Sequence, residues 1–129
     1  MNRWRDWWEQ AHADLEHARH ALADQDFDWS AFACQQAGEK ALKALLMARG
    51  AEPWGHSLTS LVEALSETMQ VPEEITEAAN RLDKHYIPAR YPNGFASGFP
   101  AKLYTRGEAK RAIDDADQIC SFGRSHLPE

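Results

Sequence analysis

The stretch from Phe27 to Gly50 is the longest uninterrupted helical signal in the chain, and both of its ends are punctuated. We expect Asp28 to be its N-cap, and Gly50 to follow its last turn in the left-handed conformation that glycine tolerates. Small residues recur inside it at alternating spacings of three and four, which places them on one face: Ala31, Cys34, Gly38, Ala41, Leu45 and Ala48. Because such a face lets another helix backbone approach closely, we predict that this helix is central in a bundle. Its outer face carries Glu39 four residues before Lys43, an exposed supporting pair.

The same periodicity marks four further segments, which we predict to be helices: residues 3–23, a stretch that begins at Ser57, residues 72–87, and residues 105–123. Ser57 is an N-cap residue, and Thr105 with Glu108 forms the pattern of a capping box. No segment alternates between apolar and polar residues in the way that a strand does. The predicted fold class is therefore all-α, an up-and-down bundle of four to five helices in a single domain, residues 1–129.

Residues 87–104, which read IPARYPNGFASGFPAKLY, interrupt this pattern before the last helix. Three prolines and two glycines are expected to exclude a regular helix there, and four aromatic residues argue against a disordered segment. Long loops in compact domains are usually either functional or disordered. The sequence therefore predicts a long loop that is packed and ordered.

Positive charge is concentrated around this loop, although the whole chain carries a formal net charge of −6. Seven bases and only two acids lie between Arg81 and Arg111. Such a segment in an acidic chain suits a phosphate group or an acidic surface on a partner, and a solvated surface with chance clustering is the alternative. We predict that its cations converge on one anion pocket, with an aromatic ring available for a base. The predicted ligand-binding residues are Lys84, Arg90, Tyr91, Lys102 and Arg106.

Several functional classes lack the residues that they need. The N-terminus has no apolar run for a signal peptide, and no stretch reaches the ~20 apolar residues of a membrane span. Glu9 and His12 form the only Glu-x-x-His motif, whereas a di-iron bundle needs two, so we expect no metal site and no cofactor. Cys34 and Cys120 lie in apolar helical settings and are predicted to be reduced thiols of a cytoplasmic protein, with a single bridge between them as the alternative.

Three tryptophans, Trp4, Trp7 and Trp8, lie close together near the start of the chain. Their large apolar surface predicts that they lie in the core or in a dimer interface. A platform for base stacking is disfavoured, because the surrounding acids would repel a phosphate backbone.

Two arginine–histidine pairs are candidates for metal-independent cleavage of a phosphodiester. In that chemistry a general base takes the 2′-hydroxyl proton, and a cation stabilises the charge on the phosphorane. Arg49 and His56 are separated by six residues across the break between two predicted helices. Arg81 and His85 lie four residues apart on one face of the predicted helix over residues 72–87. The alternative for each pair is a structural role, at a helix end for the first and on an exposed helix surface for the second.

Three motifs, taken together, resemble the HEPN domain, whose name stands for higher eukaryotes and prokaryotes nucleotide-binding. They are QQAGEKALKALL at residues 35–46, HSL at residues 56–58 and RYP at residues 90–92. The resemblance spans the chain from the first predicted helix to the last, and it implies a helical bundle that is commonly a dimer. Family members often act beside a small nucleotidyltransferase as one protein of a toxin–antitoxin pair. Others are nucleotide-binding modules or metal-independent ribonucleases.

The ribonuclease members of the family carry an arginine and a histidine with four to six residues between them, late in the domain, and two protomers complete one site. Arg49 and His56 match that spacing but lie early, whereas Arg81 and His85 have too few residues between them. The leading hypothesis is therefore a small, dimeric protein that binds a nucleotide or nucleic acid and acts with a nucleotidyltransferase partner. The alternatives are a ribonuclease with a composite Arg/His site and a pure protein-interaction module.

Overall fold

Helices form every regular element of the fold, and no strand is present. The computed structural model describes residues 1–129, and it confirms the predicted all-α fold class. The elements in chain order are α1 (Trp4–Ala23), α2 (Phe27–Ala48), α3 (Leu58–Ser66), α4 (Glu73–Asp83), the 3₁₀ turn η1 (Pro92–Gly94), the short α5 (Pro100–Leu103) and α6 (Arg106–His126).

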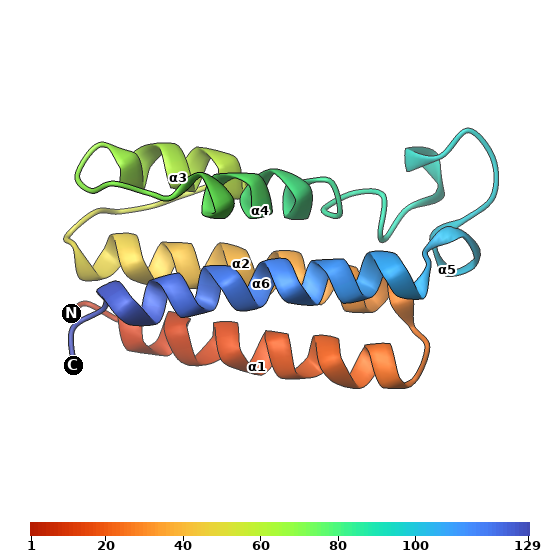
Figure 1. The fold of residues 1–129 in the computed structure, drawn as a ribbon, viewed down its shortest axis with the longest axis horizontal. Helices are drawn as coiled ribbons and strands as arrows, with labels where there is room; N and C mark the ends of the chain where they lie inside the picture. Colours follow the sequence, from red (N-terminus) through yellow and green to blue (C-terminus); the bar gives the residue numbers. More distant parts are fainter.

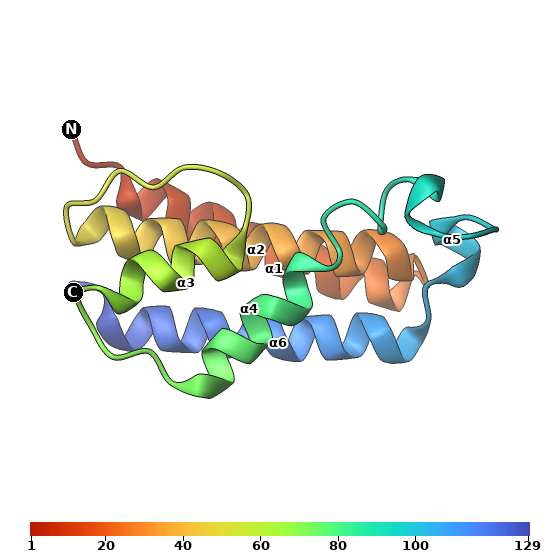
Figure 2. The same cartoon turned by 90° about the horizontal axis from the view of Figure 1, so that it is seen from above.

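The three long helices, α1, α2 and α6, run side by side, and α3 and α4 lie over α2 and α6 on the side away from α1 (Figure 1). Seen from above, α4 crosses α6 obliquely, and the two chain termini lie at the same end of the bundle (Figure 2). The connection between α4 and α6, which includes η1 and α5, lies at the opposite end. Because α2 packs against α1, α3, α4 and α6, the prediction that it is the central helix is confirmed.

Gly38 of α2 shows how the small residues allow this packing. A Cβ atom on Gly38 would lie 2.6 Å from Cδ2 of Leu58 and 3.1 Å from Cδ1 of Leu82. Both leucines are fully buried, so the first turn of α3 and the last turn of α4 pack against α2 at the point where it has no side chain. Ala31, Cys34 and Ala41 of this face are buried as well, whereas Ala48 is half-buried.

The helix caps that the sequence predicts are present at three places. Oγ of Ser57 accepts a hydrogen bond from the amide of Ser60 at the start of α3. Thr105 and Glu108 form the reciprocal capping box at the start of α6. Gly50 has a φ of 88°, which is the left-handed conformation expected after the end of α2.

The predicted N-cap of α2 is wrong by two residues. Asp26, rather than Asp28, is the N-cap, and the helix begins at Phe27. The carbonyl of Asp26 accepts the amide of Ser30 at 2.9 Å, which is the first helical hydrogen bond. Asp28 therefore lies inside the first turn, where the positive end of the helix dipole stabilises its carboxylate.

The fourth helix ends earlier than the sequence pattern predicts, at Asp83 rather than near residue 87. The amides of the next two residues bond to carbonyls three positions back, which closes the helix in tight turns. The carboxylate of Asp83 accepts the amide of Leu58 at 2.7 Å and the amide of Thr59 at 3.0 Å. Asp83 therefore caps the start of α3 from a distant part of the chain, and this contact fixes the last turn of α4.

The segment before α6 is ordered, as predicted. The prediction that its prolines and glycines exclude a regular helix is wrong, because one short helix forms there. α5 begins at Pro100, and at the first position of a helix the missing N–H of proline costs no hydrogen bond. Pro100 and Tyr104 are buried and anchor the segment to the bundle.

α6 continues to His126, past the predicted end at Gly123, and this glycine has a packing role instead. A Cβ atom on Gly123 would lie 2.8 Å from Cζ3 of Trp8. Trp8 packs against the hydrophobic core through this gap, as the core alternative for the tryptophans predicts. Trp7 is 37% exposed and contributes less to the core.

No helix combines the length and the apolar character that crossing a membrane requires. Cys34 and Cys120 are buried and unbridged, which is the predicted state of both thiols. Burial raises the pKa of both, to about 12 for Cys120. Neither is therefore a thiolate nucleophile at neutral pH.

Candidate functional site

A cavity of about 450 Å³ lies between the end of α4, the connection that follows it and the first turns of α6. Three cationic side chains line it: Arg81 from α4, Lys84 from the turn after it and Arg111 from α6. His85 and Tyr104 line the same space. The cavity thus combines several positive charges with one imidazole, a combination that suits a phosphate group.

Asp115 of α6 holds Arg81 in place. Asp115 is 2% exposed, and its carboxylate accepts two hydrogen bonds from the guanidinium, from Nε at 3.0 Å and from Nη2 at 2.9 Å. These hydrogen bonds raise the pKa of Arg81. Arg111, one turn earlier on α6, reaches the same carboxylate with Nε at 3.8 Å. Two cations therefore share one carboxylate, and the cavity keeps a positive surplus.

His85 and Tyr104 form a second pair at the cavity. Nδ1 of His85 lies 2.7 Å from the hydroxyl of Tyr104. Burial lowers the pKa of His85, although the nearby Glu108 and Asp115 act in the opposite direction. Burial also raises the pKa of Tyr104, so the phenol is neutral over the physiological range. A neutral imidazole among cations has the protonation state that a general base needs.

The two acids of the basic segment are both engaged by helix starts. Asp83 accepts the first amides of α3, and Glu108 accepts the amide and the hydroxyl of Thr105 in the capping box. Neither carboxylate forms an ion pair with a base of the segment. Asp115 is therefore the one carboxylate that forms ion pairs with the bases between Arg81 and Arg111.

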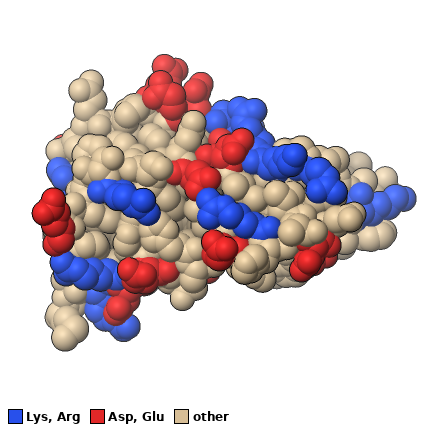
Figure 3. Space-filling view, turned by 60° about the horizontal axis from the view of Figure 1, so that its bottom comes forward, with Lys and Arg blue, Asp and Glu red and all other residues tan.

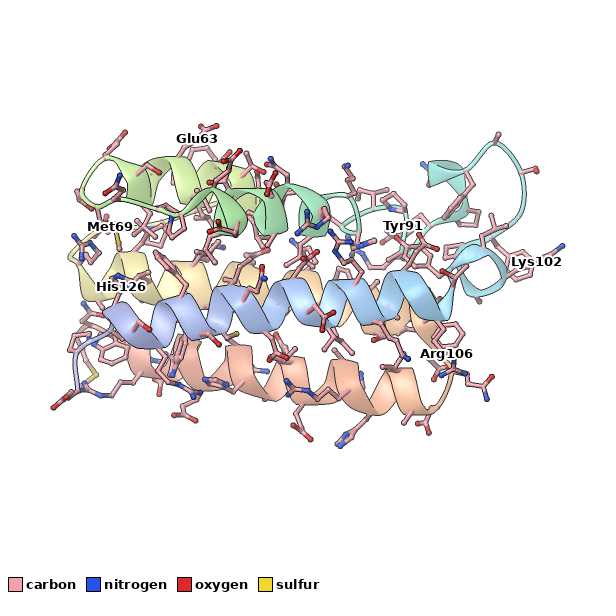
Figure 4. The ribbon with its side chains drawn as sticks, viewed as in Figure 1. Glu63, Met69, Tyr91, Lys102, Arg106 and His126 are labelled. Atoms are coloured by element: carbon pink, nitrogen blue, oxygen red, sulfur yellow. The ribbon has the colours of Figure 1, made fainter.

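The structure does not bring the five predicted ligand-binding residues together in one pocket. Lys84 lines the cavity, whereas Lys102 extends outward from α5 and Arg106 lies at the start of α6, near the ring of Phe27 (Figure 4). The tip of the molecule where α5 lies ends in a basic side chain, while both charge signs alternate along the body (Figure 3). Arg90 and Tyr91 belong to a separate cluster, because the segment after α4 turns its side chains to two different sides.

This cluster surrounds Tyr86. Its ring stacks on the imidazole of His56 with a centroid distance of 5.0 Å and an interplanar angle of 18°. The guanidinium carbon of Arg90 lies 4.6 Å from the centroid of Tyr86, 4.4 Å from that of Phe32 and 5.2 Å from that of Tyr91. His85 and Tyr86, although adjacent in sequence, thus belong to two different groups of side chains.

Glu39 and Lys43 lie beneath this cluster and are buried, which corrects the prediction of an exposed pair on the outer face. Their side chains are 5% and 9% exposed, and Nζ of Lys43 lies 3.0 Å from Oε2 of Glu39. Nδ1 of His56 lies 3.2 Å from one oxygen of Glu39 and 3.3 Å from the other. α3 and the segment around His56 cover this part of α2, which the helical periodicity of α2 alone does not reveal.

The four candidate catalytic residues form one pair in space rather than two. Arg49 lies at the end of α2 and binds Thr68, which follows α3. Its Nε donates to the hydroxyl of Thr68 at 3.3 Å, and its Nη2 donates to the carbonyl at 3.1 Å. His56 is instead held by Glu39, which lies about 15 Å earlier along the helix axis at 1.5 Å per residue. Arg81 and His85, in contrast, line the same cavity.

Sequence reasoning missed Tyr104, Arg111 and Asp115 as residues of the cavity. The spacing of Arg111 and Asp115, four residues apart on one helix, is a visible signal of a pair. The contact between Asp115 and Arg81 spans 34 residues and the contact between Tyr104 and His85 spans 19, so neither has a local sequence signature.

A larger cavity, of about 530 Å³, lies between the end of α2 and α3. Its lining is mostly apolar or neutral, and Glu52 and His56 are its titratable groups. Trp54 lies at its edge and is 87% exposed. Size alone therefore does not select the site, because the smaller cavity has the charges and the positioned imidazole.

Comparisons with known proteins give one consistent result. The family model of the HEPN domain matches residues 4–126 of the chain. The protein named "Putative toxin MJ1304" from Methanocaldococcus jannaschii is 25% identical over 129 residues, which cover 93% of this chain and 85% of that protein.

Two solved structures are similar over almost the whole chain. TT1696 from Thermus thermophilus is 50% identical with a TM-score of 0.95, and the match covers 98% of this chain and 100% of that one. ST0689, described as an archaeal HEPN homologue, is 36% identical with a TM-score of 0.84, and the match covers 99% and 100% of the two chains. The chain therefore belongs to the HEPN domain family.

Proposed function

We propose that this HEPN protein binds a phosphate group of RNA or of a nucleotide in the cavity between α4 and α6. The observation that carries the proposal is the charge of the cavity, where the three cations Arg81, Lys84 and Arg111 outnumber the two lining carboxylates. Those carboxylates are Glu108, which caps α6, and Asp115, which pairs with the two arginines. Lys84 is exposed and Arg111 is only weakly engaged at 3.8 Å, so both are available to phosphate oxygens. The guanidinium of Arg81 is held in one orientation by Asp115 and adds positive charge to the same cavity.

Salt-dependent binding of a labelled single-stranded RNA tests this proposal. We expect fluorescence anisotropy to detect binding of an RNA of about 8 nucleotides, with an affinity that falls as salt rises. Lys84→Ala removes one phosphate contact, so it weakens binding and reduces the slope of log K against log salt by about 0.7.

Lys110→Ala is the matched control, because it removes the same charge from an exposed position of α6 outside the cavity. It is expected to leave the affinity close to that of the unmodified protein. Binding that is insensitive to salt, or equal losses in the two lysine variants, would contradict a phosphate site in this cavity.

The same proposal assigns the protein to a toxin–antitoxin pair, in which it is dimeric and acts with a nucleotidyltransferase. The support is its membership of the HEPN family and the name of its M. jannaschii relative, which describes a toxin. Sedimentation equilibrium tests the dimer, which has twice the 14.6 kDa mass of the chain. Co-purification with the product of a neighbouring nucleotidyltransferase gene tests the pairing, and a monomer without a partner contradicts both parts.

Metal-independent RNA cleavage is a second candidate function, favoured by the neutral His85 beside Arg81. In this scheme His85 takes the proton of a 2′-hydroxyl, and the 2′-oxygen attacks the phosphorus. Arg81 stabilises the negative charge of the phosphorane, and the 5′-oxygen leaves as its bond to phosphorus breaks and takes a proton from water. Tyr104 keeps the imidazole oriented through its hydrogen bond to Nδ1.

Incubation of the protein with RNA in the presence of EDTA tests cleavage separately from binding. We expect products that end in a cyclic phosphate, and a loss of rate of at least about 100-fold in His85→Gln. His20→Gln, on the exposed surface of α1, is the control. Intact RNA, or an unchanged rate in His85→Gln, would leave binding as the function of the cavity.

A further inference from the structure

A second set of free polar groups lies outside the cavity, in the cluster around Tyr86. Arg90 donates one hydrogen bond from Nε to the carbonyl of Tyr86 at 2.8 Å, and neither Nη1 nor Nη2 has a protein acceptor. No carboxylate lies within ion-pair distance of this guanidinium. The side chain is nevertheless held in place, because it lies over the rings of Phe32 and Tyr86. Arg90 is thus an oriented cation with unused donors.

His56 lies on the same ring of Tyr86 and also has a free polar atom. The carboxylate of Glu39 holds Nδ1, with both oxygens within 3.3 Å, so that atom carries the proton toward Glu39. The side chain of His56 is 59% exposed, and Nε2 has no hydrogen-bond partner in the protein. Stacking on Tyr86 and the buried carboxylate together fix the ring with Nε2 available.

Three acids near this cluster are engaged by other groups of the protein, whereas Glu52, which lines the larger cavity together with His56, is exposed and forms no ion pair. Glu39 is buried and paired with Lys43, and Asp83 is engaged at the start of α3. Asp14 of α1 is paired with Lys40 of α2. No carboxylate of the protein therefore competes with an anion for the guanidinium of Arg90.

Aromatic side chains flank the two polar groups. The ring of Tyr91 is beside Arg90 and is 48% exposed, and Trp29, which packs edge-on against Phe32, is 51% exposed. Aromatic faces next to an arginine are the surface on which single-stranded nucleic acids stack their bases while the guanidinium binds the backbone. A protein partner is favoured less, because the free Nη1 and Nη2 donors of Arg90 are arranged as a phosphate requires.

We infer that Arg90, His56 and Tyr86 form a second RNA contact, outside the cavity. This inference rests on the proposed function and deepens it, because two separate phosphate contacts require a single strand of several nucleotides rather than a mononucleotide. Arg90 binds a backbone phosphate through Nη1 and Nη2, and Nε2 of His56 accepts a hydrogen bond from a ribose 2′-hydroxyl. Tyr91 stacks on a neighbouring base.

The test uses the full chain and a fluorescent single-stranded RNA of about 8 nucleotides. Arg90→Ala is expected to weaken binding about fivefold or more, and His56→Ala about twofold. Arg90→Lys keeps the charge without the planar fork and gives an intermediate loss, which also guards against a folding defect in the alanine variant. Arg124→Ala, an exposed arginine near the other end of α6, is the control and leaves the affinity unchanged.

A DNA strand of the same sequence and length tests the role of His56, because DNA lacks the 2′-hydroxyl. We expect His56→Ala to lower the affinity for RNA and to leave that for DNA unchanged. Equal effects on both strands overturn the assignment of Nε2.

The outcomes separate this inference from the proposed function. Binding that is weakened by Lys84→Ala but not by Arg90→Ala or Arg90→Lys overturns the second contact alone. No binding by the unmodified protein overturns both. A lower mass of Arg90→Ala in sedimentation, with unchanged RNA affinity, shows a protein interface in place of an RNA contact and also overturns the inference.

Discussion

The body of the bundle and the connection from α4 to α6 contain the same charged residue types but treat them differently. In the body, three cations of α1 and α2 pair with carboxylates: Lys43 with Glu39, Lys40 with Asp14, and Arg19 with Asp117. In the connection, Lys84 and Arg90 have no carboxylate partner. The acids that the sequence places near them, Asp83 and Glu108, instead accept hydrogen bonds from backbone amides at helix N-termini.

This difference shows that local charge counts are a poor guide to where a protein can bind an anion. The charged side chains of residues 35–46 are all paired within the protein. His56, which pairs with Glu39, is the group next to them that has an atom available to a ligand. In the segment from Arg81 to Arg111, two helix starts engage the acids, and Lys84 and Arg90 have no carboxylate partner. Helix capping thereby determines the electrostatics of the candidate site.

The largest expected effect tests whether the buried ion pair between Glu39 and Lys43 stabilises the body of the bundle. Glu39→Ala leaves the buried ammonium of Lys43 without its partner, so we expect the free energy of unfolding to fall by about 3–5 kcal/mol. Urea denaturation followed by circular dichroism measures it. Asp6→Ala breaks an exposed pair with Arg3 on α1 and should cost less than about 1 kcal/mol. Equal losses in the two variants would show that burial of Glu39 is unimportant.

A smaller effect is expected where Asp83 joins the two regions. Asp83→Ala removes the acceptor for two amides and two hydroxyls at the start of α3, so we expect a loss of about 2 kcal/mol in the free energy of unfolding. Asp83→Asn keeps one acceptor oxygen and should lose less. Asp114→Ala on the exposed face of α6 is the control, and a loss as large as that of Asp83→Ala would argue against a cap.

The sequence is informative about features that depend on near neighbours. Gly38 predicts a close helix contact, and Thr105 with Glu108 predicts a cap, because each depends on geometry within a few residues. The candidate site depends on contacts such as Arg81 with Asp115 and His56 with Glu39, which join residues 34 and 17 positions apart. No periodicity records such contacts. Arg90 is therefore recognisable from the sequence as a candidate cation, but its aromatic surroundings and its separation from Lys84 are not.

The smallest expected effect is the pH dependence that His85 brings to the connection. Burial lowers the pKa of His85 in the folded protein, whereas in the unfolded chain it is about 6.5. Above that pH both states hold the imidazole neutral, and His85 contributes no pH dependence. As pH falls below it, the unfolded chain takes up a proton before the folded protein does, so folding stability declines until the folded pKa is passed.

His85→Asn removes this titration, so the difference in unfolding free energy between the two proteins should change in that acidic range and stay constant above it. Urea denaturation from about pH 8 to about pH 5 measures the difference, with His20→Asn on α1 as an exposed control. Parallel curves for the protein and His85→Asn would mean that His85 is as hydrated as an ordinary surface histidine. The connection would then lose the neutral imidazole that distinguishes its cavity from the rest of the basic surface, and RNA cleavage would be the weaker of the two candidate functions.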